Sequence, residues 1–323
     1  MTPSLQILYH GNCFDGITSA AIFARFFHDR VNDAVTPVFR PMTHGQGDPY
    51  GEDHDATFWA DQNVVVDFRY SPSDRLTWWC DHHHSAFIRP EHRAHFETAP
   101  DPRRRFDPTA PSCAGLLARW LAADHGFDAS PFADHVRWAD LIDAAQFTDP
   151  AQAVELAEPA LQLMALLEAA PPEPIVSQML RGLALGSIEG VHQAPEIRRA
   201  LAPVLADHQQ TIERFRRRME VARGVAYTDL SAEGTGGFNK FIPYYLEDAL
   251  RYTVTLTLTA QRAKVSVGSN PWRRPDPLIN IADLCARYGG GGHPVVGAVS
   301  MPPDQLERAR RAAEEIVAVL RAG

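Results

Sequence analysis

The stretch CDHHHSAF (residues 80–87) places an acid and three consecutive histidines directly after the apolar run LTWW (residues 76–79). Buried imidazole nitrogens need hydrogen-bond or metal partners. Burying several neighbouring histidines without such partners therefore costs free energy. The apolar run predicts a buried strand, and the acid and histidines then follow its carboxyl end. In a parallel sheet, these ends share the edge at which ligands bind. The stretch therefore indicates an α/β fold with a polar site at one sheet edge.

The rest of the N-terminal region supports this interpretation, because strand and helix patterns alternate through the first 90 residues. A helix is predicted over 17–27, and a loop rich in glycine, aspartate and histidine over 43–56. The predicted strands are 5–10, 34–40, 63–68 and 76–80. Strands that alternate with helices indicate a parallel sheet with crossover helices.

The pattern becomes helical between about 110 and 222 and changes again near 225. A long helical segment with one internal proline, Pro203, is predicted to connect two domains, and 251–269 alternates like a β-hairpin. We predict an α/β protein with a parallel-sheet N-terminal domain, a helical connector and a smaller α/β C-terminal domain with a mixed sheet. The predicted bounds are 1–190, 191–225 and 226–323.

Composition excludes several classes of protein. The 323 residues are 45% apolar and 22% charged, with a net charge of −9, so the chain has no general attraction for nucleic acid or an anionic membrane. A nuclease acting on long tracts is therefore disfavoured. The four cysteines form no CxxC pair, and no signal peptide or membrane span is recognisable. We expect a cytoplasmic protein with reduced thiols.

Acids and histidines recur where the predicted strands end, and a further pair of acids, Asp140 and Asp143, lies in WADLIDAAQ. Carboxylates and imidazoles with little sulfur suit Mn²⁺, Mg²⁺ or Co²⁺, and clustered carboxylates repel one another unless cations lie between them. A metal pair therefore accounts for the pattern, although a single acid at a strand end is more often a helix cap. His84 is expected to lie in a solvated loop. The strand-end residues are His10, Asp15, Asp67, Asp81, His82 and His83.

Three motifs carry a family resemblance. The DHH tripeptide, the earlier H-x-x-x-x-DG of residues 10–16 and the sequence YGGGGHPVVGAVS (288–300) resemble the DHH phosphoesterase superfamily with its DHH-associated C-terminal domain. The resemblance implies a metal-dependent phosphohydrolase with a pair of Mn²⁺ ions, and Mg²⁺, Co²⁺ or Zn²⁺ as alternatives. It also implies that residues 1–190 are catalytic and that residues 226–323 bind the substrate.

The resemblance also implies two ligand sets that share Asp67. The first is His10, Cys13 and Asp67, and the second is Asp15, Asp67, His82 and Asp143, which we prefer to Asp140. Cys13 departs from the family, which has an aspartate there. A thiolate favours zinc or iron over Mn²⁺. Cys13 as a ligand, Asn12 binding through a water and a buried apolar cysteine therefore remain alternatives.

The remaining residues receive supporting roles. His83 is predicted to contact a phosphate or assist the leaving group, and Asp81 to orient an imidazole. Backbone N–H groups in the glycine run are predicted to approach an anion. Trp272 either stacks on a base or packs, and the arginines of 103–105 are predicted to lie in a solvated loop. The predicted substrate-binding residues are Gly290, Gly291, Gly292, His293, Arg287 and Arg273.

The expected substrates are short oligonucleotides or cyclic dinucleotides, cleaved at phosphodiester bonds. One alternative is a phosphatase of 3′-phosphoadenosine-type nucleotides or an exopolyphosphatase. A non-enzymatic alternative is a nucleotide-binding sensor whose metal site is degraded at Cys13. The expected partner is the short nucleotide substrate, without a membrane, and a homodimer is left open.

Overall fold

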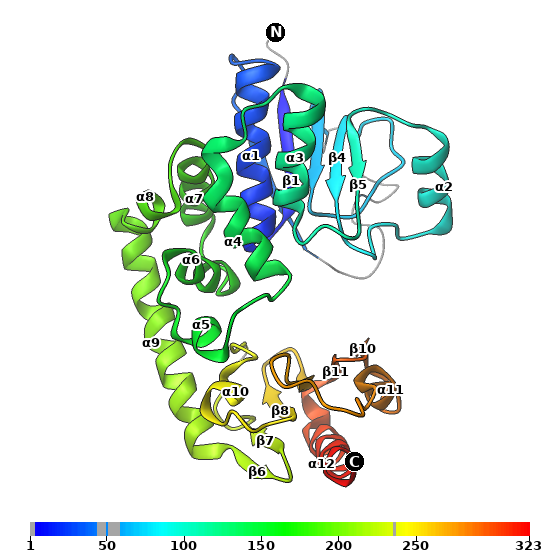
Figure 1. Ribbon diagram of the computed structural model, residues 1–323, viewed down its shortest axis with the longest axis vertical. Coiled ribbons are helices and arrows are strands. Elements are labelled where there is room, and N and C mark those ends of the chain that lie inside the picture. The colour runs from blue at the N-terminus through cyan, green and yellow to red at the C-terminus, as the bar shows by residue number, and fades with distance from the viewer. Residues whose placement is uncertain (1–3, 44–49, 51–58, 235–236) are drawn as a thin grey trace. The chain divides into compact units, whose positions relative to one another are not determined.

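The computed structural model describes residues 4–43, 50, 59–234 and 237–323 (Figure 1). The chain forms two compact units, Met1–Phe147 with Ala157–Val204, and Thr148–Leu156 with Leu205–Gly323. These units divide the long connector helix between them, whereas the sequence places boundaries at 190 and 225. The three-part division of the chain therefore stays a prediction.

The first unit contains a five-stranded parallel sheet in the order β2-β1-β3-β4-β5. Its strands are β1 (Leu5–His10), β2 (Val38–Met42), β3 (Gln62–Val66), β4 (Trp78–Asp81) and β5 (Arg104–Phe106). The predicted parallel sheet is confirmed, although β2 begins four residues later than expected. The solvated loop predicted for 103–105 is correct for Arg103, which lies in an exposed turn, but wrong for Arg104 and Arg105, which pair with β4 as part of the edge strand β5. Most of the predicted 43–56 loop lies outside the described residues.

Both faces of the central strands are buried, as their continuous apolar runs predict. Neighbouring residues of β4 show this directly. Trp78 contacts Phe23 and Phe26 of α1 (Phe14–Arg30), whereas Trp79 packs on the other face against Phe106 and other aromatic side chains. Helices α1 and α3 (Cys113–His125) lie side by side over the first face (Figure 1).

The predicted helical region is confirmed. Helix α3 begins after its N-cap Ser112 and ends at Gly126, whose φ of 63° suits glycine. The internal proline, Pro203, lies within the long helix α9. The other elements between β4 and β6 are α2 (Pro90–Thr98), η1 (Ser130–Phe132), α4 (Ala133–Asp143), α5 (Pro150–Glu155), α6 (Pro159–Glu168), α7 (Glu173–Leu185), α8 (Ile188–His192) and α9 (Pro195–Arg218).

The second unit contains a six-stranded mixed sheet in the order β10-β11-β9-β8-β7-β6, in which only the β7–β8 pair is parallel among the described strands. The predicted mixed sheet is therefore confirmed. Helix α12 (Leu306–Ala322) packs on β8, β9 and β11. The other elements are β6 (Glu220–Ala222), β7 (Val225–Asp229), α10 (Ile242–Leu246), β8 (Tyr252–Leu258), β9 (Ala263–Ser269), α11 (Ile281–Ala286), β10 (Gly291–His293), β11 (Val296–Met301) and η2 (Pro303–Gln305).

None of the described helices has the length and the apolar character needed to span a membrane.

Candidate metal centre

Two groups of potential metal ligands lie at the carboxyl edge of the parallel sheet. Within each group, one ligand atom per residue lies within 4.8 Å of the others. The first group is His10, Asp67 and His83, and the second is Asp15, His82 and Asp143. His10 is the last residue of β1, and the other residues follow β3 and β4 or lie at the start of α1 and the end of α4. The fold therefore gathers side chains that are up to 133 positions apart (143 − 10 = 133).

His82 lies at the centre of this arrangement. Its Nε2 is 3.3 Å from Asp143 Oδ2, 3.6 Å from Asp15 Oδ2 and 3.6 Å from Asp67 Oδ1. Its Nδ1 lies 2.9 Å from the carbonyl oxygen of Ala110, which can only accept, so Nδ1 carries a proton. The Ala110 carbonyl therefore orients the ring and leaves Nε2 directed at three carboxylates.

Asp67 connects the two groups. Its carboxylate is fully buried, 3.4 Å from His10 Nδ1 and 3.6 Å from Nε2 of His82, and its backbone has a φ of 56°. A left-handed backbone conformation is uncommon in residues other than glycine. Because it costs free energy, such residues are found most often at functional sites. The side chain therefore turns from the end of β3 into the space shared by both groups.

The donor atoms fit a bound cation. Neither oxygen of Asp67 nor Nε2 of His82 makes a hydrogen bond of normal geometry with any described residue, although all three atoms are buried. Buried polar atoms without such partners are rare, and a missing ion is one explanation for them. Carboxylate oxygens and imidazole nitrogens are also ligands that Mn²⁺ and Mg²⁺ accept.

The close approach of these buried carboxylates and imidazoles shifts their pKa values. Burial, reinforced by Asp67 and Asp143, raises the pKa of Asp15 well above its usual range. Burial opposes protonation of His82, but Asp67 and Asp15 raise its pKa to about 10. Burial likewise works against ionisation of Asp67, whose pKa the imidazoles of His10 and His82 nevertheless lower to about 2. Without a cation, retained protons therefore offset the excess negative charge.

We predict that the cation-free protein loses stability as the pH rises from 6.5 toward 10. A group whose pKa is raised on folding stabilises the protein fully below its unfolded pKa and ceases to do so above its folded pKa. For His82 this window runs from about 6.5 to about 10, and the contribution is on the order of several kcal/mol. The raised pKa of Asp15 acts with the same sign.

Urea unfolding in the presence of a chelator, between pH 6.5 and 8.5, measures this slope. Adding Mg²⁺ or Mn²⁺ is expected to restore stability most strongly at the higher pH, because the cation replaces the proton on His82. The His82→Gln variant is the control and should show a shallower slope. A free energy of unfolding that is constant or rises with pH in the wild type would contradict the prediction.

The other predicted residues of this unit have distinct places. Cys13, which precedes α1, belongs to neither ligand group, and burial together with nearby Asp67, Asp15 and Asp143 raises the pKa of its thiol. Asp143 lies beside His82, whereas Asp140 accepts a hydrogen bond from Ser112 Oγ.

The DHH turn is held by its own acid. Asp81 Oδ1 accepts hydrogen bonds from the backbone N–H of His82 (2.8 Å) and from Nδ1 of His83 (2.8 Å). This contact raises the pKa of His83, although burial opposes the shift. His84 is exposed. Sequence reasoning assigned His83 to the substrate, whereas the structure also brings it into the group with His10 and Asp67.

In the second unit, the glycine run has a packing role. A Cβ on Gly290 would lie 2.3 Å from the Ala298 carbonyl oxygen, and one on Gly292 would lie 2.2 Å from the Val296 carbonyl oxygen. These glycines therefore allow β10 to approach β11 closely. Gly291 faces open space, so only this member of the three could gain a side chain without a clash.

The neighbouring predicted residues are mostly exposed. His293 and Arg287 are exposed, and Arg273 forms an exposed ion pair with Asp248 at 2.9 Å. Trp272 packs against Phe241, with ring centroids 5.3 Å apart, which favours its packing alternative.

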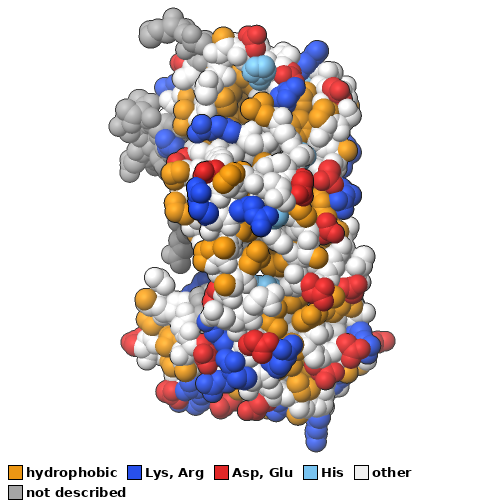
Figure 2. Space-filling model, turned by 90° about the vertical axis from the view of Figure 1, so that its left-hand side faces the viewer, with side chains coloured by type: hydrophobic (Ala, Val, Ile, Leu, Met, Phe, Trp, Pro, Cys, Tyr) orange, Lys and Arg blue, Asp and Glu red, His pale blue; other side chains and the backbone are white. Residues whose placement is uncertain are grey.

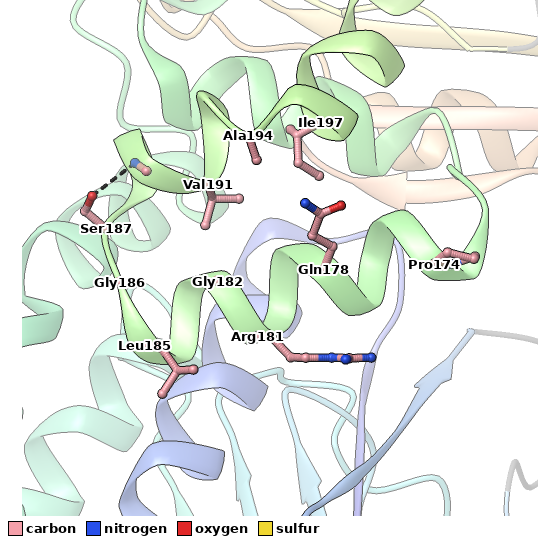
Figure 3. A pocket seen from close by; sticks show the side chains of 11 residues that line it. Pro174, Gln178, Arg181, Gly182, Leu185, Gly186, Ser187, Val191, Ala194 and Ile197 are labelled. Carbon is pink, nitrogen blue, oxygen red and sulfur yellow. Dashed lines mark hydrogen bonds between the residues drawn. The ribbon is translucent and has the colours of Figure 1, made fainter.

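A cavity of about 560 Å³ lies between α7, α8 and the start of α9 (Figure 3). Its lining includes Leu185, Val191 and Ile197, and Figure 3 shows Gln178 directed into the space. None of the potential metal ligands named above lines it. The cavity is therefore separate from the polar cluster at the sheet edge.

The described surface in Figure 2 bears acidic and basic side chains interspersed with apolar ones. This distribution agrees with the net charge of −9.

Comparison with solved structures identifies the fold. The chain resembles the pGpG-specific phosphodiesterase PggH from Vibrio cholerae at a TM-score of 0.70, with 18% identity over 98% of this chain and 99% of that one. An exopolyphosphatase-related protein from Bacteroides fragilis matches at a TM-score of 0.57, with 14% identity, over 99% and 93% of the two chains. RecJ from Thermus thermophilus, solved with Mg²⁺, matches at 0.53 with 16% identity, over 97% of this chain and 49% of RecJ.

The chain thus has the fold of the DHH phosphoesterases, as the three sequence motifs predict. No model of a known protein family matches the sequence. No curated protein matches it either.

Proposed function

We propose that this protein is a metal-dependent phosphoesterase that cleaves phosphodiester bonds in short oligonucleotides or dinucleotides. Three buried potential ligand atoms carry the proposal, because they form no hydrogen bond of normal geometry with any residue that the structure describes. They are Asp67 Oδ1, Asp67 Oδ2 and His82 Nε2. Packing alone does not explain why these polar atoms are buried without hydrogen bonds. Coordination of divalent cations would explain it.

In this proposal, Asp15, His82 and Asp143 hold one cation, His10 and His83 contribute to the other, and Asp67 serves both. Cys13 stays a predicted additional ligand. A pair of divalent cations supplies Lewis acidity toward water and toward a phosphoryl group. Mn²⁺ and Mg²⁺ suit the oxygen and nitrogen donors, and Co²⁺ and Zn²⁺ are further candidates.

Hydrogen bonds within the chain orient the potential metal ligands. Asp81 fixes the His83 ring through Nδ1, which also lies 3.6 Å from Asp67 Oδ1. Nε2 of His83 is therefore the nitrogen proposed to bind a cation or a phosphate oxygen. The amides that hold Asp15 and the carbonyl that holds His82 keep these donors oriented before substrate arrives. Preorganised donors lose little free energy to reorientation during reaction.

A short substrate suits the charge of the protein, since a chain with net charge −9 lacks a general attraction for a long polyanion. The fold is shared with a pGpG-specific phosphodiesterase over nearly the full length of both chains, which supports a dinucleotide. In the second unit, Gly291, His293 and Arg287 are proposed to contact the substrate phosphate. Arg273, Gly290 and Gly292 stay weaker candidates, because an ion pair or close packing already engages them.

We expect hydrolysis of a dinucleotide such as pGpG, dependent on Mn²⁺ or Mg²⁺ and abolished by chelation. The measurement is a product assay on dinucleotides, cyclic dinucleotides, longer RNA, 3′,5′-bisphosphate nucleotides and polyphosphate. Faster turnover of dinucleotides than of long RNA supports the proposal. Preference for bisphosphate nucleotides or polyphosphate would replace it with the phosphatase alternatives.

The same panel tests the non-enzymatic alternative. A protein that binds nucleotides but turns over none of these substrates with any of the four metals would be the sensor and would contradict the proposal.

A further inference from the structure

We infer that residues 110–114, which lead into α3, are a clasp that positions the cation-binding group of Asp15, His82 and Asp143, and that Ser112 and Asp140 are its positioning residues. The inference rests on the proposed function and extends it to residues that do not themselves belong to either ligand group. It concerns one of the two groups only.

The first contact of the clasp is with His82. The carbonyl oxygen of Ala110 accepts a hydrogen bond from His82 Nδ1 at 2.9 Å, and both groups are buried. This bond fixes the ring rotation and the tautomer together. Nε2 is then the only ring nitrogen that can face the carboxylates.

The second contact is with Asp15. Cys113 N–H donates to Asp15 Oδ2 at 2.7 Å, and Ala114 N–H donates to Oδ1 at 2.8 Å. Both N–H groups belong to the first turn of α3, where no intrahelical acceptor exists for them. One carboxylate is thus held by two backbone donors, although the two segments are almost 100 residues apart.

The third contact reaches Asp143 through its own helix. Ser112 Oγ accepts from Gly115 N–H at 2.9 Å and donates to Asp140 Oδ1 at 2.5 Å. Asp140 lies in the last turn of α4, three residues before Asp143, which ends the helix. Terminal helical turns fray readily, so an anchor in this turn restrains the residue that ends it.

Glycine at position 115 agrees with this anchor. A Cβ there would lie 2.6 Å from Asp140 Oδ1. The absence of a side chain lets the Asp140 carboxylate approach the first turn of α3, where the N-terminal end of the helix favours negative charge.

The ligand group of His10, Asp67 and His83 is oriented by other hydrogen bonds. His83 is held by Asp81, whereas the clasp directs its hydrogen bonds to His82, to Asp15 and, through Ser112, to Asp140. Loosening the clasp should therefore weaken one cation site and spare the other.

The test is Mn²⁺ binding to the full-length protein, measured by calorimetry and by the electron paramagnetic resonance of free Mn²⁺. Ser112→Ala is expected to weaken one site by about 10–100-fold and to leave the other within a factor of about two. Asp140→Ala breaks the same hydrogen bond, keeps the cap and should give the same result. Ser112→Thr and Asp140→Asn preserve the hydrogen bond and should bind almost as the wild type does.

The matched control is Ser187→Ala. Ser187 caps α8 by accepting from Gly190 N–H at 3.0 Å, in the same way as Ser112 caps α3, but it lines the separate cavity and belongs to neither ligand group. Both alanine variants should lose about 1 kcal/mol of stability through the cap, and only Ser112→Ala should lose metal affinity.

A double-mutant cycle assigns the weakened site. In an Asp143→Asn background, Ser112→Ala should add little, whereas in a His10→Gln background it should have its full effect. Unchanged Mn²⁺ binding, equal weakening of both sites or failure of Ser112→Thr to rescue would overturn the clasp while leaving the proposed function intact. A wild-type protein that binds no divalent cation would overturn both.

Discussion

Replacing Asp67 by asparagine is expected to lower the rate of phosphodiester hydrolysis by at least about a thousandfold. The shared carboxylate is proposed to serve both cations, and its loss removes several kcal/mol of stabilisation from the site. Asparagine keeps the shape and tolerates the left-handed backbone, where φ is 56°. The substitution therefore tests the charge without adding backbone strain, which alanine would add.

The measurement combines turnover of a dinucleotide with calorimetric titration of Mn²⁺. Asp74→Ala removes an exposed aspartate after the same strand and is the matched control, with turnover expected to stay within about twofold. If Asp67→Asn keeps wild-type turnover and cation binding, the proposed site at the sheet edge is wrong.

Replacing Gly16 by alanine is expected to destabilise the protein and to abolish most of its activity. A Cβ at this position would lie 2.1 Å from the carbonyl oxygen of His10. At an exposed helical position, glycine to alanine usually stabilises by roughly 0.5–1 kcal/mol. Here the obstacle is backbone, which cannot rotate away, so we expect a net loss of about 1–3 kcal/mol or more.

The reason for lost activity is local. Gly16 allows α1 to begin directly beside the end of β1, and this close approach sets His10 and Asp15 on either side of the turn. Chemical denaturation and dinucleotide turnover are the two readouts. Gly190→Ala, in helix α8, is the matched control, because its Cβ would meet only the Ser187 hydroxyl at 3.3 Å. A Gly16→Ala protein as stable and active as Gly190→Ala would refute the proposed constraint.

Much of the fold follows from local patterns. The apolar runs before His10, Asp67 and Asp81 are long enough to mark buried strands, and the polar residue that ends each run marks a ligand-facing edge. The strand at 104–106 escaped prediction because a run of arginines does not resemble a strand. As an edge strand it keeps Arg105 exposed, which no local pattern reveals.

The glycine run shows a similar division. Its sequence indicates close backbone approach, but it does not say what approaches. The structure places the backbone of β11 against Gly290 and Gly292, while Gly291 alone of these three remains open.

The sequence by itself determined which side chains stand at the strand ends, because continuous apolar runs and the polar residues that end them act over a few positions. Only the tertiary structure decided that His83 joins His10 and Asp67, that Asp143 and not Asp140 lies beside His82, and that residues 110–114 orient Asp15. The backbone contacts to Asp15 alone join segments as much as 99 positions apart. All of these contacts depend on how helices pack on the sheet, and no local preference encodes that packing.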